Sequence, residues 1–97
     1  MIRLQIQSDA QENALDIIRS AIASETSRLE FGLKVTERHI RVFEDRYRVT
    51  SDTFLRDFAA EDLADGDREY VCWAGELKIR ERIAAQLETI KGIQYAA

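Results

Sequence analysis

Apolar residues recur at intervals of seven along the first half of the chain, on two adjacent tracks. The first track is Leu15, Ile22, Leu29, Thr36 and Phe43, and the second is Ile18, then Thr26, Leu33, Ile40 and Tyr47. This spacing predicts one long helix over residues 9–47, in which the two tracks form a continuous apolar edge. A hairpin turn at Gly32 is the competing interpretation. We favour a continuous helix because the residues around Gly32 include no turn formers and the sevenfold spacing passes through it in phase.

A second, shorter helix is predicted over residues 50–59. Thr50 is placed as its N-cap, where a side-chain oxygen accepts a hydrogen bond from a free backbone N–H group. Val49 and Phe54 stand at the two positions of a hydrophobic staple, which fixes the direction in which the chain enters the helix.

The third predicted helix covers residues 67–92, with Asp67 as its cap and Gly92 as its end. Its apolar face is formed by Tyr70, Trp73, Leu77, Ala84 and Leu87, and is broadened by Ile79, Ile83 and Ile90. An apolar face this wide indicates contact with two neighbours. The sequence therefore predicts an all-α fold, a coiled-coil-like helical hairpin made of a long helix, a short crossing helix and an antiparallel returning helix.

The first residues alternate strictly between apolar and polar side chains. Period two is typical of a half-buried strand, so a short strand or arm is predicted within residues 1–8. The rest of the chain offers it no second strand, and we expect it to pair with a second copy or with a partner's sheet edge. Two such strands paired across a dimer would present Arg3, Gln5 and Gln7 to the major groove of DNA.

The third helix is shorter than the first, and folded back it would cover only the part from Leu29 to Tyr47. Because a helix over residues 9–47 would be roughly 55 Å long, while a compact chain of this size has a radius of gyration of about 13 Å, part of its edge must meet another surface. An uncovered apolar stripe marks an interface. We therefore predict a homodimer through Leu15, Ile18, Ile22 and Leu29.

Composition favours one soluble domain over residues 1–97. Charged residues make up 33% of the chain and apolar residues 45%, and proline, the usual helix breaker, is absent. A net charge of −4 argues against a dedicated nucleic-acid binder, whose domains are usually basic. A lone cysteine and the lack of a signal peptide or of a bilayer-length apolar stretch predict a cytoplasmic protein without a membrane anchor.

Catalytic and metal-binding patterns are weak. His39 is the only histidine and has no nucleophile beside it in a known motif, and Cys72 next to Trp73 is interpreted as a small buried apolar residue. One histidine and one cysteine cannot assemble a zinc site in a monomer. We therefore expect no enzymatic activity, no cofactor and no metal.

An acidic cluster stands between the second and third helices. Its members are Asp57, Glu61, Asp62, Asp65, Asp67 and Glu69; with Arg68 as the single base, residues 57–69 carry −5. Acids at helix ends for solubility are one interpretation, and an electrostatic docking face for a basic protein partner is the other. The spacing Asp65-x-Asp67-x-Glu69 also resembles part of a calcium loop, although the rest of that pattern is missing.

Three stretches carry a resemblance to a known family. They are Val42-Phe43-Glu44-Asp45-Arg46-Tyr47, then Thr50-Ser51-Asp52-Thr53-Phe54 to Phe58, then Glu69-Tyr70-Val71 with Trp73. The chain resembles, over about residues 28–92, the TumA-like antitoxins, which are small helical proteins of archaea and cyanobacteria encoded beside a toxin gene. Arg48 departs from the pattern, in which glycine often stands at this turn.

The resemblance implies a prokaryotic toxin–antitoxin system, in which this chain binds and neutralises a toxin protein without catalysis of its own. Protein binding is therefore the function that we expect. A dimeric DNA-binding repressor that uses the amino-terminal strands is the alternative, and an antitoxin that also binds its operator DNA would combine the two.

Overall fold

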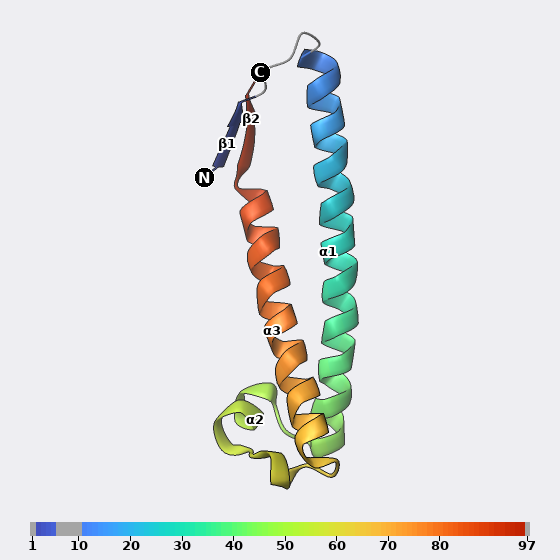
Figure 1. Cartoon of the computed structure of the whole chain (residues 1–97), viewed down its shortest axis with the longest axis vertical. Coiled ribbons are helices and arrows are strands. Elements are labelled where there is room, and N and C mark those ends of the chain that lie inside the picture. Colours follow the sequence, from blue (N-terminus) through green and yellow to red (C-terminus); the bar gives the residue numbers. More distant parts are fainter. Residues whose placement is uncertain (1, 6–10, 97) are drawn as a thin grey trace.

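In the computed structural model, which describes residues 2–5 and 11–96, the chain forms a helical hairpin closed at one end by a short crossing helix (Figure 1). The elements in order are β1 (Ile2–Gln5), α1 (Gln11–Tyr47), α2 (Ser51–Asp57), the 3-10 turn η1 (Ala60–Asp62), α3 (Gly66–Lys91) and β2 (Ile93–Ala96). The predicted all-α hairpin is confirmed. The expected start of the first helix at residue 9 lies outside the described residues.

α1 is a single helix of 37 residues that runs through Gly32 without a turn, as the sevenfold spacing predicted. α3 returns antiparallel to it over 26 residues. Three levels of contact show this register: Arg46 pairs with Glu69, the Thr36 hydroxyl lies 3.1 Å from the Glu76 carbonyl oxygen, and Gly32 lies against Ile83.

Local interactions and backbone angles before and after α2 explain how the chain connects α1 to α3. The Thr50 side chain accepts a hydrogen bond from the Thr53 backbone N–H at 3.2 Å, which confirms the predicted N-cap. Arg48, just after α1, has a φ of +55°, a left-handed conformation that favours glycine. α3 begins one residue earlier than predicted, at Gly66, whose φ is +52°, so Asp67 lies in its first turn instead of capping it.

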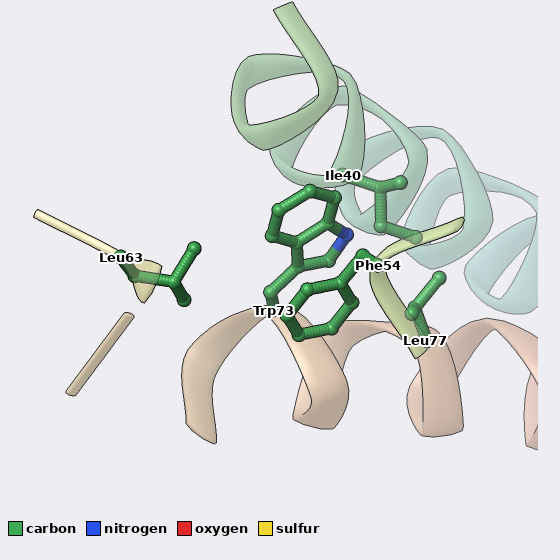
Figure 2. Packing of buried hydrophobic residues seen from close by; sticks show 5 residues of the cluster. All are labelled: Ile40, Phe54, Leu63, Trp73 and Leu77. Carbon is green, nitrogen blue, oxygen red and sulfur yellow. The ribbon is translucent and has the colours of Figure 1, made fainter. Parts of the chain in front are cut away.

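The hydrophobic core lies at the closed end, where α1, α2 and α3 meet (Figure 2). Its buried members are Ile40, Phe54, Leu63, Trp73 and Leu77, packed against the partly buried Phe43, Tyr47, Val49, Phe58, Tyr70 and Ala74. Toward the open end only Leu29 and Ile83 are buried among the described apolar residues of the two long helices. Burial is therefore concentrated at one end of the rod.

β1 forms as predicted, but its partner was predicted wrongly. It pairs in parallel with β2 of the same chain, with Ile2 opposite Ile93 and Gln5 opposite Ala96. The pairing is possible because α3 ends at Lys91 and the chain continues past Gly92 in an extended conformation, so that β1 and β2 lie side by side at the open end of the hairpin (Figure 1).

The shape is a rod, with extents of 61 × 20 × 18 Å and a radius of gyration of 19.1 Å. A compact chain of the same length would have a radius of about 13 Å. The accessible surface of 7199 Å² likewise exceeds the roughly 5,700 Å² expected for a folded monomer of 11.2 kDa.

Candidate functional site

At the closed end of the hairpin, the segments that carry the acidic cluster pack on a group of aromatic side chains from α1, α2 and α3, which we call the aromatic platform. Trp73 of α3 is fully buried, and the Phe54 ring of α2 stacks on it with centroids 3.9 Å apart and planes 4° apart. Phe43 and Tyr47 of α1 stack on the same indole at 5.4 and 5.9 Å. Rings from three helices therefore share one stack, with Trp73 at its centre.

A buried polar chain ties α2 to the two long helices. The indole N–H of Trp73 donates to Ser51 Oγ at 3.0 Å, and Ser51 Oγ donates to Glu44 Oε2 at 2.8 Å. The same Glu44 oxygen accepts the Ser51 backbone N–H at 2.8 Å. Glu44 thus satisfies a free N–H at the start of α2, where the helix dipole also favours a carboxylate.

Glu69 does not belong to the exposed acidic surface, and this part of the predicted binding site was wrong. Its side chain is buried, and its carboxylate accepts hydrogen bonds from the Arg46 guanidinium and the Tyr47 hydroxyl. The Tyr47 hydroxyl also accepts the Ala64 backbone N–H at 2.9 Å. Burial and the bond to Glu69 raise the pKa of Tyr47 above its ordinary value of 10.0.

Glu69 is also not placed to bind calcium, because both of its carboxylate oxygens already accept hydrogen bonds from Arg46 and Tyr47. Its sequence position gave a usable signal. Glu69 stands four residues before Trp73, so the two share one face of α3 and the carboxylate follows the indole toward the core. Spacing on the helix therefore outweighs the proximity of Glu69 to other acids along the chain.

The other five acids of the cluster are exposed, and they differ in what they contact. Asp57 lies beside Arg56 at 3.1 Å, Asp65 lies 3.8 Å from Arg68, and Asp62 accepts the Ala59 backbone N–H at 2.8 Å. Glu61 and Asp67 are also exposed and have no hydrogen bond or ion pair among the described residues. The structure thus brings five carboxylates onto one ordered end.

His39 is held by an acidic partner halfway along the hairpin. Its Nδ1 pairs with a carboxylate oxygen of Glu76, whose other oxygen accepts the Thr36 hydroxyl at 2.7 Å. Thr36 is buried, so this set joins the middle of α1 to the middle of α3. Cys72, in contrast, is exposed, and the prediction that it is buried was wrong. Adjacent helical residues lie about 100° apart, so the burial of Trp73 does not extend to its neighbour.

The predicted dimer residues fall into two groups. Leu29 is 5% exposed and borders a surface groove of about 420 Å³ with Ala85 and Ile90 of α3, so it packs within its own chain and is not a free interface residue. Leu15, Ile18 and Ile22 are half-buried and lie in the part of α1 that precedes the buried contacts with α3. Their role in a dimer stays a prediction.

The predicted DNA contacts lie on β1. Arg3 and Gln5 are exposed, whereas Gln7 lies outside the described residues. Because one edge of β1 is occupied by β2, a ribbon of two β1 strands cannot form through that edge. DNA binding by these residues stays a prediction that the pairing of β1 does not favour.

No group of three or more histidine, cysteine, aspartate or glutamate side chains that could hold a metal ion occurs in the described part of the chain. None of the helices described is long and apolar enough to cross a membrane.

Comparison with known proteins adds no relative. No family model matches the chain, and neither a curated protein nor a solved structure is detectably similar to it.

Proposed function

We propose that this chain is a protein-binding module whose acidic end docks onto a basic protein, and that the partner is a toxin that the chain neutralises. The observation that carries the proposal is the ordered acidic end. Five exposed carboxylates lie on α2, on η1 and at the start of α3, where Asp65 precedes the first turn and Asp67 lies in it. The stack around Trp73 and the bonds of Tyr47 hold these segments together. A fixed array of like charges speeds encounter with a basic surface and selects among partners.

The antitoxin assignment rests in addition on the resemblance to the TumA-like family. The aromatic residues that carry this resemblance are the ones that build the platform: Phe43, Tyr47, Phe54, Phe58, Tyr70 and Trp73. The matching stretches therefore form one structural unit that presents the acidic residues. Preorganised side chains lose less conformational entropy on binding, which supports recognition at this end.

The test uses the product of the adjacent reading frame. Expressed alone it should arrest growth, and co-expression of this chain should restore growth. The purified pair should associate with a rate that falls steeply with ionic strength, since exposed charges are screened over about 8 Å at physiological salt.

Two exposed acids offer a clean perturbation, because neither makes a contact that the fold needs. Glu61→Lys with Asp67→Lys should slow association at least about tenfold, and Asp16→Lys with Glu37→Lys, which changes the net charge equally at exposed sites on α1, should not. Equal association rates in the two double variants would contradict docking through the acidic end, and a harmless neighbouring gene product would contradict the antitoxin role.

A further inference from the structure

The large apolar side chains that are exposed on the described part of α1 all lie on its side away from α3. They are Ile17, Phe31 and Val42, with exposed fractions of 60%, 70% and 61%. Phe31 stands nine residues before the buried Ile40, which is two and a half turns, so the two point in opposite directions. Val42 stands eleven residues after Phe31 and Ile17 fourteen before it, so the three lie within about 40° of arc.

These three side chains belong to a longer stripe with the spacing of a coiled coil. Its positions follow one another at alternating intervals of four and three residues, as the a and d positions of a heptad do. Sustained over nearly four heptads, this spacing is typical of a face that meets another helix. We call it the outer stripe, and its members are Ile17, Ala21, Ser24, Arg28, Phe31, Val35, Arg38 and Val42.

No described element packs against the outer stripe. α1 forms one margin of the rod and has α3 along its other side (Figure 1). Val35 is half-buried, and the other members of the stripe are exposed. The accessible surface of 7199 Å² also exceeds by about 1,500 Å² the roughly 5,700 Å² expected for a folded monomer of this mass. A standard interface removes only about 800 Å² from each partner, so a second copy can be accommodated.

The outer stripe is complementary to itself when two copies run antiparallel. A twofold axis between residues 29 and 30 sets Ile17 of each copy opposite Val42 of the other. Toward the axis, it sets Ala21 opposite Arg38, Ser24 opposite Val35 and Arg28 opposite Phe31. The two small members therefore meet larger side chains, and both arginines meet uncharged ones. A self-complementary surface of this kind is what a symmetric pair of identical subunits requires.

The two arginines of the stripe disfavour a parallel arrangement. Parallel copies in register would set Arg28 and Arg38 each beside the same residue of the other copy, and facing like charges oppose association. In the antiparallel arrangement Arg28 meets the ring of Phe31, whose face attracts a guanidinium. The charge of Arg28 is also already paired, since its Nε lies 2.6 Å from Glu25 Oε1. Charged residues at core positions thus select one orientation.

The antiparallel arrangement also separates the acidic ends of the two copies. Tyr47, where α1 ends, lies about 26 Å from the twofold axis, so the two closed ends would stand about 50 Å apart. Exposed charges are screened over about 8 Å at physiological salt, so the two clusters would not repel each other. A parallel pair would instead bring two segments of charge −5 to the same end.

We propose that two copies of this chain pair through the outer stripe of α1, as an antiparallel dimer whose acidic ends point in opposite directions. Ile17 and Val42 pack together near both ends of the contact, and the two Phe31 rings pack near its middle. A contact of this symmetry closes after two subunits. The proposal is independent of the antitoxin role, because it requires no other protein.

Sedimentation of the full chain at about 1–100 µM tests the proposal, since the population of a dimer depends on concentration. The wild-type protein should be a dimer, and Val42→Glu should raise its dissociation constant at least about tenfold, because a charge would be buried without a partner. Val71→Glu is the matched control, a valine of α3 that is 66% exposed, and should stay dimeric. Both positions face solvent in the single chain, so both variants should keep the helical circular-dichroism signal.

Engineered cysteines test the antiparallel register. Ile17→Cys combined with Val42→Cys, in a Cys72→Ser background, places two thiols about 37 Å apart along one helix, too far for an internal disulfide. Across the dimer each would face the other, so oxidation should give a covalent dimer. Ile17→Cys alone in the same background should not cross-link, because the two copies of position 17 would also lie about 37 Å apart.

Several results would refute the proposal. They are a wild-type protein that is monomeric at about 100 µM, equal weakening of the dimer by Val42→Glu and Val71→Glu, and efficient cross-linking of Ile17→Cys alone. A dimer that is lost in Ile18→Glu but kept in Val42→Glu would place the interface on the opposite edge of α1. A monomer in which Val42→Glu impairs capture of the neighbouring gene product would show that the outer stripe binds that protein and not a second copy.

Discussion

Ser51→Ala is the most informative single change at the closed end, because it removes one atom from a buried polar chain and changes the volume little. Ser51 is 4% exposed and Trp73 is fully buried. The Ser51 hydroxyl accepts the indole N–H at 3.0 Å and donates to Glu44 at 2.8 Å. The bond from the Ser51 backbone N–H to Glu44 would remain, so the start of α2 keeps its partner.

The expected cost follows from the donor that is left behind. An indole N–H enclosed by aromatic rings has no access to water, and a buried donor without a partner costs about 1–3 kcal/mol. We therefore expect the free energy of unfolding to fall by about 2 kcal/mol. That loss is a large share of the roughly 5–15 kcal/mol by which small domains are stable.

A double-mutant cycle with Trp73→Phe isolates this contribution, measured by urea unfolding followed by circular dichroism. Phenylalanine has no N–H, so Ser51→Ala in the Trp73→Phe background should cost less than about 1 kcal/mol. The coupling energy between the two positions should then be about 1–2 kcal/mol. Additive effects of the two substitutions would show that the buried hydrogen bond does not stabilise the fold.

Three further predictions concern single positions. Gly32→Ala should raise the free energy of unfolding, measured by urea unfolding, by up to about 1 kcal/mol, because alanine favours the helix. Its Cβ would meet Ile83 Cδ1 at the contact distance of 3.4 Å. A lower free energy of unfolding would mean that the Ile83 side chain cannot shift to accommodate it. Arg48→Gly should be more stable than Arg48→Ala by about 1 kcal/mol in thermal unfolding, because φ here is +55°. The raised pKa of Tyr47, caused first by burial and then by the bond to Glu69, contributes stability that is present below pH 10.0 and lost as pH rises through the folded-state pKa. Tyr47→Phe should therefore flatten the alkaline decline in stability, and an unchanged decline would contradict the raised pKa.

The hairpin could be predicted because its signals are periodic and local. The tracks through Leu29 and Ile40 define the edge of α1, and Thr50 with Thr53 forms the cap that starts α2. The shorter length of the third helix also indicated correctly that α3 covers only the later part of α1. Among described side chains of α1, the buried ones begin at Leu29.

What the sequence did not reveal depends on contacts between distant segments. The strand Ile93–Ala96 is too short to show a pattern of its own, and it forms because β1 pairs with it. Glu69 was grouped with its acidic neighbours along the chain, although its bonds to Arg46 and Tyr47 come from α1. Charge along a sequence does not show which acids turn inward. The face of the helix on which an acid lies shows whether it turns inward.

The candidate site and the rod shape have a common physical origin. Most of the buried apolar volume lies around Trp73, so the closed end is held by several independent contacts, whereas the open end depends on Leu29, Ile83 and a two-stranded sheet. Regions with few buried contacts open at lower free energy than the core. A surface at the closed end is therefore ordered before a partner arrives, and charges fixed there can steer an encounter without a cost of ordering.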